Sequence, residues 1–233
     1  GNLEAFKSAL EDIQSQQVDS VVSLGDNIGY GADSEKVIQL LISNDITSVL
    51  GNHEMAALNN KVFNWYTGEV KKAIEIAIAS LSEASLKYLK ESKISISMSG
   101  CFFVHGFPPD SFRLYLHQVG EEQLRQAFTE MKDNLCFVGH THKLRALVYE
   151  NNQVLLQPMN KDPLKIQKNK KYIITAGSFG QPRDGSAQAK YVIWDSRTCQ
   201  LEIRAIEYDS ATAAQKIIAA GIPSRFADLI SGK

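Results

Sequence analysis

The stretch LCFVGHTHKLRAL, residues 135–147, runs from a short apolar segment directly into two histidines that are separated by one threonine. Four to eight apolar residues bounded by turn residues are typical of a buried strand. Three other apolar segments end in polar residues in the same way: VVSLGDN (21–27), TSVLGNHE (47–54) and CFFVHG (101–106). Ligands of open α/β sheets bind beyond the carboxyl ends of the strands, so we expect these four ends to meet at one site.

The rest of the chain predicts the layers around those strands. Helical spacing over residues 3–17 and 34–44, each followed by a strand-like segment, indicates βαβ units and a parallel sheet. Residues 55–92 form a predicted helical insert, residues 93–209 are rich in strand-like segments, and residues 211–232 resemble two short helices. All 233 residues are therefore expected to form a single α/β domain with mixed sheets.

Composition excludes several kinds of partner. The chain has 25 lysine and arginine residues and 26 acidic residues, so electrostatic binding to nucleic acid or to an anionic membrane is not indicated. The lysine-rich segment 161–172 lacks interleaved aromatic residues and is expected to be a solvated loop. No apolar run approaches the ~18 residues of a membrane helix. Three cysteines, an odd number without a CxxC pair, predict reduced core residues and a reducing compartment, the cytoplasm.

The four strand ends offer one carboxylate, one amide oxygen and several imidazoles. These side chains belong to Asp26, Asn52, His53, His105, His140 and His142. Mixed nitrogen and oxygen ligands suit a first-row divalent metal. Two such ions about 3.5–4 Å apart, bridged by a carboxylate, can bind a phosphate and activate water. A single strand end of this kind is usually only a turn, but four together predict a functional site.

Taken together, the motifs at the four strand ends resemble those of the calcineurin-like metallophosphoesterases. GDNIG (25–29), GNHE (51–54), VHG (104–106) and GHTH (139–142) follow in the family's order. GSFGQPRDG (177–185) is similar to a loop of a bacterial branch that includes diadenosine-tetraphosphatase-like and YfcE-like phosphodiesterases, and the helical insert is similar to that of the same branch. The resemblance implies a four-layer αββα sandwich, with two mixed sheets face to face and helices outside.

The resemblance also implies roles for individual residues. Asp26 would bridge two divalent ions, of manganese, iron, zinc or nickel. Three ligands, Asn52, His105 and His140, would complete the second metal site, and His142 would serve the first.

Catalytic roles follow from the same resemblance. His53 would protonate the leaving oxygen, and Glu54 would orient its ring. Apart from the resemblance, Arg183 is a candidate for contact with a substrate phosphate because a guanidinium can bind phosphate bidentately, although an ion pair between Arg183 and Asp184 is an equal alternative. Asn27 is a further candidate for substrate contact.

One family motif has no counterpart in this sequence. Family members commonly carry Asp-x-His-Gly-Asn-Leu, and the chain opens with GNLEAF. We expect the missing strand and its Asp-x-His to be absent from the sequence as given, or to come from a separate segment. Without them, the first metal site would keep only Asp26 and His142.

The implied function is hydrolysis of a phosphodiester or nucleotide-type phosphoester through a metal-bridging hydroxide, with a small molecule as substrate. A second interpretation is a catalytically weak scaffold that binds proteins, as the same fold does in the retromer complex. A metallo-β-lactamase-type hydrolase requires an HxHxDH signature, which GHTHK does not supply. Trp65 and Tyr66 are either core residues or a stacking surface for a nucleobase, and one of Pro108 and Pro109 could be cis.

Overall fold

The strand β5 (Leu135–Val138) lies inside the molecule in this computed structural model, which describes residues 1–160 and 162–232. Its side chains alternate between two cores. Leu135 and Phe137 pack toward one hydrophobic cluster, whereas Cys136 and Val138 pack toward another that contains Phe128. Both faces are covered, which explains why the segment is apolar throughout.

β5 belongs to a six-stranded mixed sheet with the order β3-β4-β5-β9-β6-β7. Its other strands are β3 (Ser95–Met98), β4 (Cys101–Val104), β6 (Leu144–Glu150), β7 (Gln153–Gln157) and β9 (Lys171–Ala176). The three strands β4, β5 and β9 run parallel, so β4 and β5 deliver their carboxyl ends to the same edge. The remaining pairings are antiparallel.

Two smaller sheets complete the strands of the described residues. β10 (Ala189–Asp195), β11 (Gln200–Ile206) and β8 (Leu164–Lys165) are antiparallel. β8 lies within the segment predicted to be a loop, of which residue 161 lies outside the described residues. β1 (Val22–Ser23) and β2 (Thr47–Ser48) pair in parallel and are only two residues long each, much shorter than the predicted strands. Among the described strands, β1 pairs on one side only.

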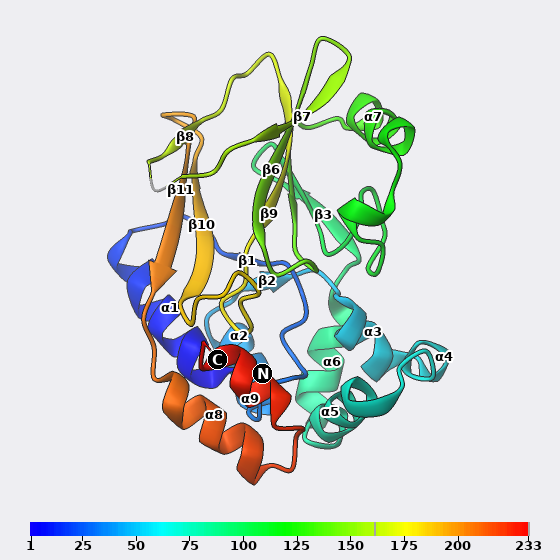
Figure 1. The fold of residues 1–233 in the computed structure, drawn as a ribbon, viewed down its shortest axis with the longest axis vertical. Helices are drawn as coiled ribbons and strands as arrows, with labels where there is room; N and C mark the ends of the chain where they lie inside the picture. The colour runs from blue at the N-terminus through cyan, green and yellow to red at the C-terminus, as the bar shows by residue number, and fades with distance from the viewer. Residues whose placement is uncertain (161, 233) are drawn as a thin grey trace.

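Helices gather on the side of the molecule where the strand ends lie (Figure 1). They are α1 (Leu3–Ser15), α2 (Ser34–Ser43), α3 (Asn52–Leu58), α4 (Asn60–Phe63), α5 (Gly68–Ala79), α6 (Glu83–Glu91), α7 (Glu121–Glu130), α8 (Ser210–Ala219) and α9 (Arg225–Ile230). Only α7 packs against the six-stranded sheet away from the others, beside β7 (Figure 1). α3 to α6 follow one another along the chain between β2 and β3.

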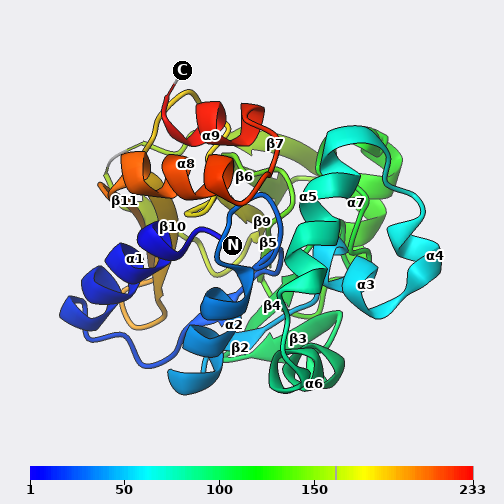
Figure 2. The same ribbon diagram turned by 90° about the horizontal axis from the view of Figure 1, so that it is seen from below.

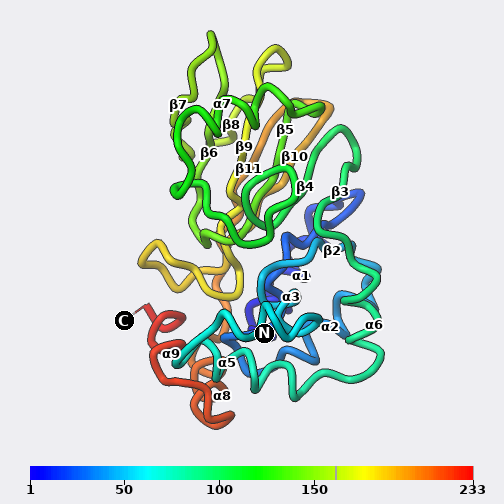
Figure 3. Tube along the Cα trace, turned by 90° about the vertical axis from the view of Figure 1, so that its right-hand side faces the viewer, coloured from blue at the N-terminus to red at the C-terminus, as the bar shows by residue number. Residues whose placement is uncertain are grey.

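The helical half contains both ends of the described chain (Figures 2 and 3). α1 starts at Leu3 because the side chain of Asn2 accepts a hydrogen bond from the backbone of Ala5 at 3.1 Å. The predicted mixed α/β fold with sheets flanked by helices is confirmed. Within the described residues, no helix is both long enough and apolar enough to cross a membrane. The bond between Pro108 and Pro109 is cis.

Candidate metal centre

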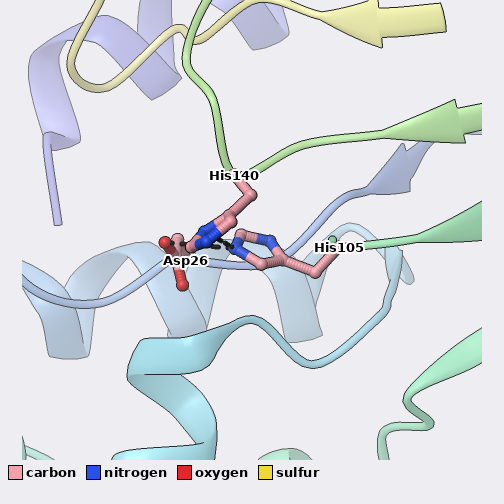
Figure 4. Close-up of side chains that lie close together, drawn as sticks. All are labelled: Asp26, His105 and His140. Atoms are coloured by element: carbon pink, nitrogen blue, oxygen red, sulfur yellow. Dashed lines mark hydrogen bonds and ion pairs between the residues drawn. The ribbon is translucent and has the colours of Figure 1, made fainter. Parts of the chain in front are cut away.

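The strand ends meet as predicted, and four potential metal ligands converge on one point. The Nε2 atom of His105 lies 3.3 Å from a carboxylate oxygen of Asp26, 3.0 Å from the amide oxygen of Asn52 and 3.1 Å from the Nδ1 atom of His140. Figure 4 shows the Asp26, His105 and His140 side chains pointing toward one another from three separate segments. Among the described residues, these three form the one cluster with metal-ligand geometry, with ligand atoms within 4.8 Å of each other.

The separations fit a divalent metal ion. Nitrogen and oxygen ligands lie about 2.0–2.2 Å from zinc in a tetrahedral site, so ligand atoms around one ion stand roughly 3.3 Å apart. The distances of 3.0, 3.1 and 3.3 Å around the His105 nitrogen match that spacing. The donor set is one carboxylate oxygen, one amide oxygen and two imidazole nitrogens. Its members are the types of ligand that manganese, iron, zinc and nickel accept.

Each histidine of the centre is held in one tautomer by a backbone carbonyl. The carbonyls of Leu24, Arg113 and Gln181 lie 2.6, 2.9 and 2.8 Å from a ring nitrogen of His105, His140 and His142, respectively. A carbonyl oxygen can only accept, so the ring nitrogen must carry the hydrogen and donate it. The other ring nitrogen of each histidine then offers its lone pair. Such outer contacts are what orient histidine ligands of metals.

Electrostatics favour the protonation states that bind a metal. Burial would raise the pKa of Asp26, but the positive charges that His105 and His53 can carry outweigh burial and hold this pKa well below its usual range. Burial, reinforced by repulsion from His105, lowers the pKa of His140 to about 3. Burial and Arg183 lower the pKa of His142 to about 4. An ionised carboxylate and neutral imidazoles are the forms that coordinate metals.

His105 differs from the other two histidines. Burial tends to lower its pKa, but the adjacent Asp26 carboxylate raises it above the ordinary value. A cation at this position therefore stabilises the centre, whether it is a proton or a metal ion.

The loop that carries Asp26 has an unusual backbone. Asp26 itself has φ of 55°, and His140 and His142 both have φ of 59°, in the left-handed region that non-glycine residues rarely adopt. The preceding Gly25 also has a positive φ of 83°, and a Cβ atom there would come within 2.4 Å of the Gly51 nitrogen. Glycine is therefore required where the two strand ends touch.

The side chain of Glu54 contacts the backbone of the Asp26 loop and not the ring of His53. Its buried carboxylate accepts hydrogen bonds from the backbone amides of Asp26 at 2.8 Å, Asn27 at 2.6 Å, Ile28 at 3.3 Å and Gly51 at 2.9 Å. This carboxylate fixes the strained Asp26 loop to the start of α3. The ring of His53 is oriented instead by the carbonyl of Ile28, which lies 2.8 Å from its Nδ1 atom.

His53 lies beside the centre with a free nitrogen. Its side chain is fully buried, and its Nε2 atom has no hydrogen-bond partner among the described residues. The ring of Tyr30 packs edge-on against it, with ring centroids 4.5 Å apart. A buried nitrogen without a partner is costly to the fold unless a bound group satisfies it.

Asn27 and Arg183, the two residues predicted to contact a substrate, have different hydrogen-bond partners. Both amide atoms of Asn27 are engaged, by the hydroxyls of Ser23 at 2.6 Å and Ser48 at 2.9 Å, so this side chain ties β1 to β2. The predicted contact between Asn27 and a substrate stays a prediction. The guanidinium of Arg183 bonds the side chain of Gln181 at 3.1 Å.

The alternative interpretation of Arg183 is wrong, since its neighbour has another partner. Asp184 pairs with Lys190 at 2.8 Å. Among the described residues, Arg183 has no ion pair with a carboxylate, so its charge is available to a ligand.

Sequence reasoning missed the contribution of the helical insert. The hydroxyl of Tyr66 accepts a hydrogen bond from the amide nitrogen of Asn52 at 2.7 Å. This contact sets the rotation of the amide so that its oxygen faces His105. The neighbouring Trp65 is half exposed and stacks on Phe112. Only the proximity of an aromatic pair to the site motif could have suggested the contact.

Comparisons with known proteins place these features in a family. A family model described as the calcineurin-like phosphoesterase superfamily domain matches residues 1–198. An uncharacterized protein of Methanocaldococcus jannaschii is 28% identical over 228 residues, which cover 95% of this chain and 90% of that protein.

Solved structures agree with the family model. A metallophosphoesterase from Sphaerobacter thermophilus is 26% identical with a TM-score of 0.83, over 99% of this chain and 95% of that one. A hypothetical protein from Pyrococcus horikoshii shares the fold at 16% identity and a TM-score of 0.74, over 99% of this chain and 93% of that one.

Proposed function

Because the chain belongs to the calcineurin-like phosphoesterase superfamily, we propose that it hydrolyses a phosphodiester or nucleotide-type phosphoester at a binuclear metal centre. The observation that supports the proposal most directly is the convergence of Asp26, Asn52, His105 and His140. These residues would hold one ion, and Asp26 with His142 would contribute to a second. When bound, such ions polarise a phosphoryl group and lower the pKa of water to near neutrality.

The chain's own side chains supply the remaining steps. In the imidazolium form, His53 carries a proton on both ring nitrogens: Nδ1 donates to the carbonyl of Ile28, and Nε2 donates its proton to the leaving oxygen. Arg183 binds a phosphoryl oxygen through its guanidinium, which is suited to that geometry. Glu54 is a positioning residue, since it holds Asp26 in place. Burial of the centre excludes bulk water and strengthens each of these contacts.

We also propose that the protein works in a reducing compartment such as the cytoplasm. Support comes from Cys101, Cys136 and Cys199, which are all buried free thiols. Burial raises the pKa of the Cys101 thiol to about 11, so this cysteine is held in its unreactive form.

The test combines metal analysis with turnover. After reconstitution with manganese, elemental analysis of the wild-type protein should find metal bound, and the protein should hydrolyse bis(p-nitrophenyl) phosphate or p-nitrophenyl phosphate. Asp26→Asn should lose both metal and turnover, since its carboxylate is shared. Near-normal metal content and activity in that variant would refute the assignment. Bound metal without turnover of either ester in the wild-type protein would favour a scaffold.

A further inference from the structure

A second cavity, of about 490 Å³, lies next to the metal centre. Its walls include Tyr30, Gln181, Arg183, Val70, Arg225 and Phe226, and we call it the outer cavity. Tyr30 and Gln181 also line the cavity that contains the Asp26, His105 and His140 side chains. The two spaces therefore share a wall made of these two side chains, and a molecule bound at the metal centre can extend past them.

One hydrogen-bond donor of the shared wall has no acceptor among the described residues. The side-chain nitrogen of Gln181 is buried and has no partner among the described residues, and only 3% of this residue is exposed. The oxygen of the same amide accepts from Arg183, whose charge has no ion pair within the described chain. A buried donor without an acceptor destabilises the fold unless a ligand supplies one. Oxygen atoms of an anionic ligand would satisfy both groups.

The far wall of the outer cavity is apolar at its base and charged at its rim. Phe226 is buried, with its ring centroid 4.8 Å from that of Tyr30. Arg225 lies over the Phe226 ring at 4.7 Å and forms an ion pair with Glu69 at 2.7 Å. Half of the Arg225 side chain is exposed, at 51%, so its guanidinium can exchange one anionic partner for another.

The charge of the lining is positive. The lining residues include two arginines, Arg183 and Arg225, and one carboxylate, Asp228. Arg225, Phe226 and Asp228 all lie in α9, beyond the residues 1–198 that match the family model. Figure 2 shows α9 above the chain start and beside α8, in the helical half of the molecule. The far wall therefore lies outside the segment that the family model matches.

We infer that the outer cavity binds the leaving-group side of the phosphoester and selects leaving groups with an apolar ring and a negatively charged substituent. The inference rests on the proposed function, in which His53 faces the leaving oxygen. Tyr30 lies between His53 and Phe226, so a group leaving from the His53 side meets this aromatic wall first. The charged substituent then reaches Arg225 at the rim.

A matched pair of substrates tests the charge selection. 4-Carboxyphenyl and 4-carbamoylphenyl phosphoesters have nearly the same shape, but only the first carries a charged substituent. They are offered both as monoesters and as methyl diesters, and the type of ester that is turned over is used. The measured quantity is the ratio of kcat/KM for the two. Comparing this ratio between variants cancels the difference in acidity of the two phenols.

Two variants should move the ratio in opposite directions. Arg225→Gln removes the rim cation and should lower the preference for the carboxyl ester by roughly two- to fivefold. Glu69→Gln frees Arg225 from its competing carboxylate and should raise it by about twofold. Arg197→Gln removes the same charge from a surface ion pair with Asp195, at the far end of the β10–β11 hairpin, and should leave the ratio unchanged.

A third variant tests the shared wall. Gln181→Met keeps the length of the side chain but removes both the unpartnered donor and the oxygen that accepts from Arg183. The gain and the loss in stability should offset each other, so the thermal midpoint should hold while KM increases for both esters. A purely structural role would instead lower the midpoint with no change in KM.

The outcomes separate the inference from the function on which it rests. Turnover of neither ester by the metal-loaded wild-type protein would overturn the proposed function. Turnover of both esters, with one ratio shared by wild type, Arg225→Gln and Glu69→Gln, would overturn the inference and leave the function standing. Opposite shifts in the two variants, with Arg197→Gln at the wild-type ratio, would support it.

Discussion

Replacing Glu54 by glutamine is the sharpest test of how the centre is built. One carboxylate oxygen accepts from the amides of Asn27 and Ile28, and the other accepts from those of Asp26 and Gly51. Glutamine converts one of these oxygens into an NH₂ group, which cannot accept. Two buried amides lose their acceptor at a cost of about 1–3 kcal/mol each, so the variant should lose roughly 2–6 kcal/mol of stability.

The assays are thermal unfolding of the metal-free protein and calorimetric titration with manganese. In a domain of this size, each kcal/mol shifts the midpoint by about 2–4 °C, so a fall of roughly 10 °C is expected. Manganese affinity should fall as well, because the Asp26 loop is no longer held. Glu91→Gln, at an exposed position of α6, is the matched control and should stay within about 0.5 kcal/mol of wild type.

The sequence-based alternative predicts a different result for the same variant. If Glu54 served only to orient the ring of His53, the substitution would change the pH profile of turnover and leave the midpoint and metal affinity as they are. An unchanged midpoint and affinity would therefore refute the role that we assign to this carboxylate.

Three further variants probe other contacts. His53→Ala should keep its metal but slow turnover most for esters with poorly acidic leaving groups, and loss of metal would make His53 a ligand instead. Tyr66→Phe frees the amide of Asn52, so manganese affinity measured by calorimetry should fall about tenfold, and an unchanged affinity would contradict the positioning role. Asp12→Asn should cost about 1 kcal/mol at pH 7, because the carboxylate accepts two hydrogen bonds from Arg204 at 3.0 and 2.7 Å. Those hydrogen bonds lower the pKa of Asp12, so the stabilisation is present above its ordinary value and is lost as pH falls through the lowered one. Urea unfolding should show the wild type and Asp12→Asn converging below about pH 4, and a constant difference would contradict this.

The sequence predicted where the ligands meet because that depends on topology alone. β4 and β5 run parallel and adjacent, so His105 and His140 follow the same edge of one sheet. Asp26 and Asn52 follow β1 and β2, which are parallel neighbours in a second small sheet. Apolar runs that end in polar residues therefore locate the site without any knowledge of distances.

The hydrogen bonds around the ligands could not be predicted in the same way. The carboxylate of Glu54 reaches four amides only because the Asp26 loop adopts a left-handed conformation, which no residue type in GDN specifies except the glycine. The contact between Tyr66 and Asn52 depends on how the segment between α4 and α5 packs against the start of α3. Such contacts follow from tertiary structure, so sequence periodicity carries no signal for them.

The same contacts weigh against a scaffold without chemistry. Three residues of the centre, Asp26, His140 and His142, have left-handed backbones, and conformations of this kind cost of order 1–3 kcal/mol each. The buried nitrogen of His53 adds the cost of a missing hydrogen bond. A protein-binding surface draws on exposed side chains, whereas His53 and His105 are almost completely buried and unable to contact another protein. An ion and a small substrate that bind at this buried site would explain the strained backbone and the unpaired nitrogen. Binding stabilises the folded protein and so offsets the free-energy cost of both features.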